Sequence, residues 1–106
     1  MRLLLRWSMP SYRITVTIGA LNPGVEPPSV LPSAARAAEE LTTVEASDLG
    51  IVSGMPRITV RFTGDDAENA RHIAQHVVET VSTLAQPLAS TVTERVKGRW
   101  LVIRRS

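Results

Sequence analysis

The residues best suited to chemistry in this sequence are two histidines four positions apart. His72 and His76 share one face of an expected helix with Glu68 and Glu79, because the four positions are spaced i, i+4, i+8 and i+11. Two imidazoles and a carboxylate one turn away can hold a divalent metal. The segment reads His-Ile-Ala-Gln-His, however, and lacks the glutamate of the His-Glu-x-x-His motif. The four residues point away from the apolar side of the helix, so we expect His72 and Glu79 to be exposed and no specific metal to bind.

No other pattern predicts catalysis or a cofactor. The chain has no cysteine, which excludes disulfides, thiolate metal sites and cysteine nucleophiles. It also lacks the glycine-rich phosphate loops and the Gly-x-Ser-x-Gly elbow. Both histidines lie on one helix, and most serines lie in expected turns or caps. We therefore expect a non-enzymatic protein with no catalytic residues, and the cysteine-free composition fits a cytoplasmic location.

One long loop leads into a helix N-terminus, a position that attracts anions. Residues 19–29 contain Asn22-Pro23-Gly24, typical of a type II turn, and a Pro-Pro pair that bars regular structure. Ser29 is the expected cap of the helix that follows. The loop resembles a rigid spacer more than a phosphate cradle, and binding of a small ligand there remains an alternative.

The length and charge of the chain indicate one domain without a strong electrostatic field. Its 106 residues carry 12 basic and 10 acidic side chains, a net charge of +2. No run approaches the ~20 apolar residues of a membrane helix. Residues 1–11 are expected to be a flexible N-terminal extension, with Met9 as a candidate natural start, and residues 12–106 to form the domain.

The strongest signal is an internal repeat. The segment Arg13-Ile-Thr-Val-Thr-Ile-Gly recurs from Arg57 as Arg-Ile-Thr-Val-Arg-Phe-Thr-Gly. Both copies alternate apolar and polar residues, as half-buried strands do. Each copy leads through a helix-like segment to another threonine-rich strand, at residues 42–47 and 88–96. A bulge or bend at residues 48–50 and a turn at residues 53–56 place a hairpin between the second and third strands.

The helices and the last hairpin follow from similar patterns. Residues 65–84 carry an apolar stripe that includes Val77, with Asp65 as the expected cap and Glu68 three residues later. The first helix begins at Ser29 and packs small alanines on the sheet. Val44 and Ala46 are expected to point inward from the second strand. A Lys97-Gly98 turn joins residues 88–96 to a fifth strand at residues 99–104, with Arg95 opposite Trp100.

The order β-α-β-β-α-β, with one added C-terminal strand, resembles the ferredoxin-like split βαβ sandwich. This resemblance covers residues 12–105 and implies an α+β fold in which both helices cover one sheet face. The two repeated strands would then be central, adjacent and antiparallel. The resemblance concerns the fold alone, since this fold carries many unrelated functions.

The uncovered sheet face is the expected interaction surface. It should display threonines and arginines of the central strands and an aromatic residue near one edge, which are Arg13, Thr15, Thr17, Thr59, Arg61, Thr93, Arg95 and Trp100. Trp100 and Arg61 are the expected anchors, because tryptophan and arginine are enriched at interface hot spots.

We therefore expect a small protein–protein interaction module, a homodimer that associates through this open face or a sheet edge. One alternative is a ligand-sensing regulatory domain. The other is a weak nucleic-acid-binding domain that uses the Arg/Thr face, although the central strands lack aromatic residues for base stacking and the charge is small.

Overall fold

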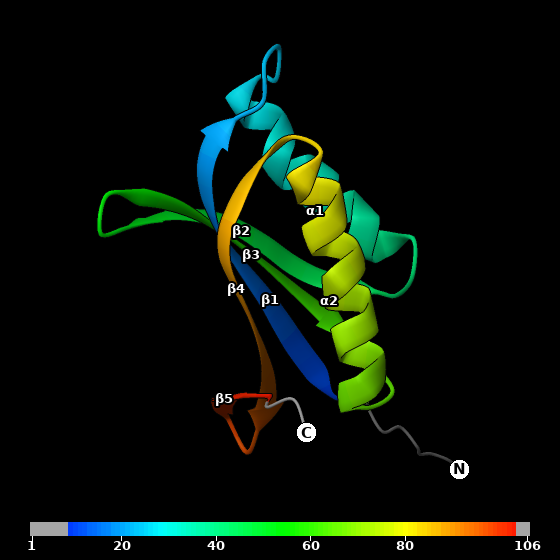
Figure 1. The fold of residues 1–106 in the computed structure, drawn as a ribbon. Coiled ribbons are helices and arrows are strands. Elements are labelled where there is room, and N and C mark those ends of the chain that lie inside the picture. Colours follow the sequence, from blue (N-terminus) through cyan, green and yellow to red (C-terminus); the bar gives the residue numbers. More distant parts are fainter. Residues whose placement is uncertain (1–8, 104–106) are drawn as a thin grey trace.

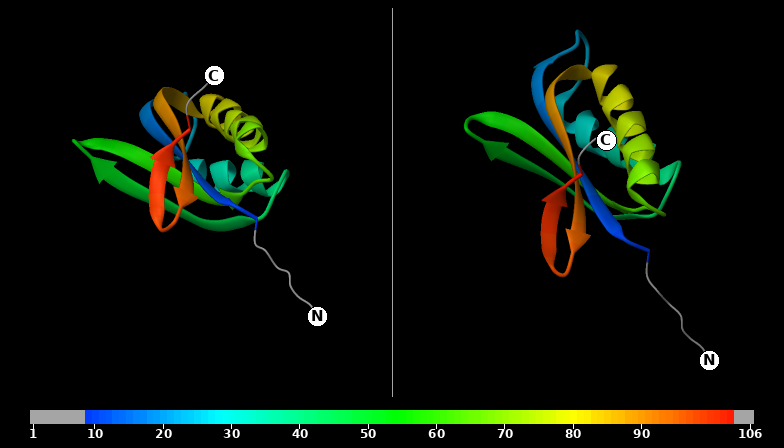
Figure 2. Two further views of the ribbon diagram at one scale, coloured as in Figure 1. Left: turned by 90° about the horizontal axis from the view of Figure 1, so that it is seen from below. Right: turned by 60° about the horizontal axis from the view of Figure 1, so that its bottom comes forward.

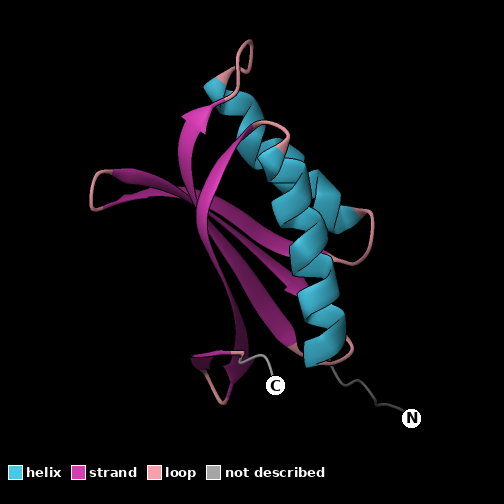
Figure 3. Ribbon diagram, in the orientation of Figure 1, coloured by secondary structure: helices cyan, strands magenta, loops and turns pink. Residues whose placement is uncertain are grey.

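The computed structural model describes residues 9–103 as an α+β fold with five antiparallel strands and two helices. Figure 1 shows both helices on one side of the sheet, and Figure 3 shows the same arrangement by secondary structure. The strands run in the spatial order β2-β3-β1-β4-β5. The elements are β1 (Ser11–Leu21), the 3-10 turn η2 (Pro27–Ser29), α1 (Val30–Glu39), β2 (Val44–Val52), β3 (Met55–Thr63), α2 (Ala67–Ser82), β4 (Ala85–Val96) and β5 (Arg99–Val102).

The two repeated segments are adjacent antiparallel strands, as predicted. Ile14 lies opposite Val60, and Thr15 lies opposite Thr59. Alternate residues of β1 and β3 are buried beneath the helices, so the period-2 pattern correctly identified the core face. The aromatic rings of Tyr12 and Phe62 stack across this pair with centroids 6.0 Å apart. Val60 is fully buried, as expected.

The helix α2 packs its apolar stripe on the sheet and starts one residue later than predicted. Val77 is fully buried, whereas His72 and Glu79 are exposed, as expected. The cap is Asp66 and not Asp65, because the Asp66 carboxylate accepts a hydrogen bond of 2.8 Å from the Asn69 backbone N–H. The reciprocal acceptor is the Asn69 side chain, which bonds the Asp65 backbone N–H at 3.0 Å. Glu68 is therefore not the capping-box partner.

The segment before α1 also departs from the prediction. Gly24 has a φ of +83° and the Val25 N–H donates to the Asn22 carbonyl, which confirms the turn. The Pro-Pro pair, however, opens a one-turn 3-10 helix instead of excluding regular structure. Ser29 does not cap α1 with its side chain, because its hydroxyl donates to the Glu26 carbonyl at 2.7 Å.

The edge strand β2 contains a bulge, but it lies at Glu45 and not at the expected residues 48–50. Its register against β3 shifts between Val44 and Ala46, so Val44 packs against the core while Ala46 is exposed beside Arg61. The prediction that Ala46 points inward is therefore wrong. The expected bulge or bend at residues 48–50 is regular strand instead. Beyond it the β2–β3 hairpin projects past the helices (Figures 1 and 2).

The C-terminal hairpin has the predicted register, with Arg95 opposite Trp100 across β4 and β5. Lys97 and Gly98 both have positive φ, as a two-residue type I′ turn requires. The strand β4 begins at Ala85, earlier than predicted, and pairs with the end of β1. The expected N-terminal extension lies outside the described residues as far as residue 8. No helix within residues 9–103 is both long and apolar enough to cross a membrane.

Candidate functional site

The open sheet face carries all eight residues that the sequence predicted there. β1 and β3 supply five of them from the centre of the sheet, β4 supplies Thr93 and Arg95, and β5 supplies Trp100. The five residues of β1 and β3 alternate with buried positions of these strands, so their side chains project away from the helices. Thr93 shares their face because it pairs with Arg13; Arg95 lies two residues further along β4, and Trp100 pairs with Arg95. Near the middle of the face the Thr15 and Thr59 hydroxyls approach to 3.4 Å.

Three arginines gather around one tryptophan on this face. The guanidinium carbon of Arg13 lies 3.9 Å from the Trp100 ring centroid, with Arg61 at 5.3 Å and Arg95 at 5.8 Å. These four residues are called the Arg–Trp cluster below. Cation–π attraction holds the guanidinium groups to the ring, and this attraction is stronger for Trp than for other aromatic side chains. The sequence predicted the face but not this convergence, because Trp100 reaches diagonally across two strands.

A single carboxylate contacts the cluster among the described residues. Arg61 Nε donates to Glu45 Oε1 at 2.8 Å, and the same oxygen accepts a bond of 2.9 Å from the Ser11 hydroxyl. Glu45 reaches this face because it occupies the β2 bulge. Arg13 and Arg95 have no carboxylate within 4.0 Å in the part of the chain that the structure describes. The cluster is therefore locally cationic.

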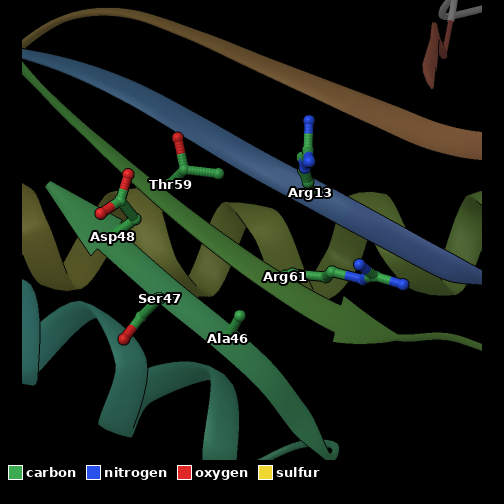
Figure 4. Close-up of a pocket in the computed structure, with 6 residues that line it drawn as sticks. All are labelled: Arg13, Ala46, Ser47, Asp48, Thr59 and Arg61. Carbon is green, nitrogen blue, oxygen red and sulfur yellow. The ribbon is translucent and has the colours of Figure 1, made fainter. Parts of the chain in front are cut away.

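A hollow of about 290 Å³ adjoins the Arg–Trp cluster. Figure 4 shows Arg13 and Arg61 toward one end of it and Asp48 with Thr59 toward the other. Its lining is completed by two small residues of β2, Ala46 and Ser47. The hollow therefore has a basic end and an end with a hydrogen-bond acceptor.

The projecting β2–β3 hairpin forms a second, apolar surface that the sequence analysis missed. Leu49 is 52% exposed and Ile51 67% exposed, and Val52 and Met55 are also exposed beside them. Because Leu49 lies opposite the buried Ile58, it and Ile51 share the helix side of the sheet. The signal in the sequence was the run Leu-Gly-Ile-Val, which extends beyond the length that α1 can cover.

Leu49 and Ile51 also line an apolar hollow of about 180 Å³ between the hairpin and the start of α1. Its other walls come from the end of β1, the 3-10 turn, the start of α1 and the base of β3. They are Ile18, Gly19, Leu21, Pro27, Val30, Leu31, Pro56 and Ile58. The segment predicted as a long loop, residues 19–29, thus contributes aliphatic groups to this hollow from the end of β1 and from the 3-10 turn. Its composition suits an apolar side chain better than an anion.

The outer edge of β2 is unpaired within the described residues. β2 bonds only to β3, and it ends the sheet order on that side. Its backbone N–H and C=O groups on the outer side are therefore available to another strand. We call residues 46–55 the β2 arm. It comprises the unpaired edge, the projecting hairpin and the exposed aliphatic side chains.

The histidine stripe does not converge on a metal site in the structure. His76 Nε2 lies 2.8 Å from Glu40 Oε1 at the end of α1, and Glu79 accepts a hydrogen bond from Gln75. His72 is exposed and takes no part in either of these contacts. Residues 9–103 contain no group of three or more histidine, cysteine, aspartate or glutamate side chains placed to hold a metal. His76–Glu40 is a contact between helices that the sequence spacing did not predict.

Comparisons with protein-family models, with curated proteins and with solved structures find no match to this chain.

Proposed function

We propose that this protein is a small non-enzymatic interaction module that self-associates through the outer edge of its sheet, at the β2 arm. We further infer a ferredoxin-like split βαβ domain, extended by β5. The order β2-β3-β1-β4, with each helix joining strands separated by one neighbour, supports this arrangement.

The observation that carries the proposal is a sheet edge that is unpaired among residues 9–103 and lacks the usual protection. Edge strands normally deter pairing with a second chain through lysine, proline, inward charges or bulges. From Ala46 to Val52 the only charged residue is Asp48, and the bulge lies before this stretch. The exposed aliphatic residues Leu49 and Ile51 lie on the same stretch. Such an edge favours pairing with another extended strand.

The stretch is self-complementary about one residue. If two copies of β2 pair antiparallel with Gly50 opposite Gly50, then Leu49 of each lies opposite Ile51 of the other. Both aliphatic pairs then lie on the helix side of the sheet. Aliphatic cross-strand pairs contribute roughly 0.2–1 kcal/mol each, in addition to the burial of their exposed surface. This contact is isologous and closes at a dimer.

The sheet edge is favoured over the open face by charge. β1 is the middle strand of five, so a twofold axis through the centre of the face runs close to it. Packing of the two faces about such an axis would bring two locally cationic Arg–Trp clusters into one interface, and like charges disfavour close approach. Pairing at the β2 edge keeps the two Arg–Trp clusters apart.

The test is the oligomeric state of Leu49→Asp/Ile51→Asp. We expect the unmodified protein to be dimeric and the double variant to be monomeric but folded, because the charges would be buried without partners in the contact. Light scattering coupled to size exclusion over a range of concentrations measures mass, and circular dichroism checks folding. Leu41→Asp is the matched control, since Leu41 is 46% exposed beyond the end of α1 and should leave the dimer intact.

Two results would contradict the proposal. The first is an unmodified protein that stays monomeric at the highest concentrations. The second is a dimer that survives Leu49→Asp/Ile51→Asp but dissociates in Trp100→Ala/Arg61→Glu, which would identify the open face as the interface.

A further inference from the structure

We propose that the Arg–Trp cluster and the adjoining hollow form a binding site for a small hydroxylated phosphomonoester, such as a sugar phosphate. The phosphate would lie at the Arg13–Arg61 end and the hydroxyl groups at the Asp48 end. This proposal does not depend on self-association, because the site lies on the open face and the β2 arm buries its aliphatic groups on the other.

The first argument is unbalanced charge. Three guanidinium groups lie within 6 Å of one ring centroid, and among the described residues only Arg61 has a carboxylate partner. Guanidinium groups stay charged under all ordinary conditions. Holding them together without an anion is electrostatically unfavourable, and a phosphomonoester dianion would remove that cost.

The second argument is geometry and order. A guanidinium presents parallel N–H donors that match two oxygens of a phosphate. Arg13 is half-buried and packed on Trp100 at 3.9 Å, so its side chain is already ordered before a ligand arrives. An ordered donor loses less conformational entropy on binding than a free surface arginine. The Thr59 hydroxyl lines the same hollow and can donate to the ligand or accept from it.

The third argument concerns the opposite end of the hollow. Asp48 lines it and is an acceptor of hydrogen bonds when ionised, so it favours hydroxyl groups and disfavours a second anionic group. The hollow of about 290 Å³ is close to the lower limit of ~300 Å³ for small-molecule sites. A compact molecule with one phosphate and several hydroxyls satisfies both ends.

A single-stranded nucleic acid fits this site less well. Base stacking needs free aromatic faces on the central strands, where this protein has Thr15, Thr17 and Thr59. Arg13 already packs on the Trp100 ring. Asp48 would also lie in the path of a continuous phosphate backbone that followed the hollow.

Calorimetric titration of the full chain tests the proposal, with four probes at one ionic strength: ribose 5-phosphate, inorganic phosphate, ribose and single-stranded oligouridine. We expect ribose 5-phosphate to bind more tightly than inorganic phosphate, and ribose to show no binding. Arg13→Gln should weaken ribose 5-phosphate at least tenfold. Asp48→Asn should reduce the preference for ribose 5-phosphate over inorganic phosphate. Arg36→Gln, the same change on an exposed residue of α1, should have no effect.

Circular dichroism confirms folding, and Arg61→Gln, at the other arginine that lines the hollow, replaces Arg13→Gln if the latter does not fold. Absence of binding by both phosphates at millimolar concentration would overturn the proposal. Equal binding by Arg13→Gln and Arg36→Gln would also overturn it, as would binding of oligouridine alone with affinity that rises with length. The monomeric variant Leu49→Asp/Ile51→Asp should still bind ribose 5-phosphate, so failure of one proposal is distinguishable from failure of the other.

Discussion

Replacing Gly64 with alanine should destabilise the fold through a single contact with the core. Gly64 follows β3 and is buried, and its N–H donates to the Pro10 carbonyl. A Cβ at this position would come within 3.0 Å of Tyr12 Cε2 and 3.1 Å of Cδ2. Ordinary carbon–carbon contacts are about 3.5–4.0 Å, so the Tyr12 ring or the backbone would have to move.

The magnitude follows from how little room the ring has. Tyr12 is buried and stacked on Phe62, which is also buried, so a displacement would spread through the centre of the core. Overpacking of this kind costs about 1–3 kcal/mol. The lost flexibility of glycine in the unfolded chain offsets roughly 0.4–1 kcal/mol. We therefore expect the free energy of unfolding to fall by a net amount on the order of 1–2 kcal/mol. Each kcal/mol lowers Tm by about 4–8 °C in a domain of this size.

Gly50→Ala is the matched control, because nothing lies within 4 Å of its added Cβ. Urea denaturation followed by circular dichroism compares the two variants, both in the Leu49→Asp/Ile51→Asp background so that association does not contribute. Gly50→Ala should be as stable as its parent or slightly more stable. Adding Tyr12→Leu to Gly64→Ala should reveal coupling, since the smaller side chain removes the clash. Equal stability of the two alanine variants would refute the reasoning.

Three further predictions concern the helix and the titration of the core. Asp66→Ala should lose about 1 kcal/mol of unfolding free energy because its carboxylate caps α2; Asp65→Ala should lose less, and equal losses by urea denaturation would point to charge alone. Val77→Asp should abolish the folded circular dichroism signal by burying an unpaired charge, whereas His72→Ala should change stability by no more than about 0.5 kcal/mol. Burial raises the pKa of Tyr12 above 10.0, and the nearby Glu94 and Asp66 raise it further. The protonated hydroxyl of Tyr12 therefore contributes to the free energy of unfolding below pH 10, and this contribution is lost as pH rises through the folded pKa. The stability of the unmodified protein relative to Tyr12→Phe should therefore be constant from pH 8 to 9 and should fall as pH rises through 10. A difference that changes below pH 9 would contradict this cause.

The central sheet was predictable because local pattern and global arrangement agree there. Alternation fixed which side of Ile14 and Val60 is buried, and the repeated segment identified the two strands that pair. The Lys97-Gly98 turn likewise fixed the register of the last hairpin, because both positions need positive φ and only a two-residue loop fits.

The sequence-based predictions failed where the local sequence is compatible with more than one structure. Asp65 and Asp66 are equivalent as caps in sequence, and only the extended backbone at Asp66 decides between them. The bulge near Glu45 has no glycine to mark it, and a shift of one residue moves Ala46 to the other face. The contact of His76 with Glu40 depends on how two helices lie side by side, which periodicity within one helix does not encode.

The candidate surfaces were also only partly predictable from the sequence. The sequence predicted the residues of the open face, since strand alternation places them, but it could not predict that three arginines converge on Trp100. That convergence needs the twist of the sheet and the diagonal reach of long side chains. The β2 arm was missed because a run of aliphatic residues in a strand predicts burial. Only the positions of the helices show that these residues are exposed.

The two proposals together imply a particular arrangement of the dimer. Antiparallel pairing of two β2 edges about Gly50 has its twofold axis perpendicular to the sheet, so the pleat continues from one copy to the other. Leu49 and Ile51 of both copies then lie on the helix side, and both Arg–Trp clusters lie on the opposite side. The apolar contact and the polar site therefore do not compete for the same residues. Asp48 lines the hollow from β2, and in this register it lies opposite Val52 of the second copy with its side chain on the open face.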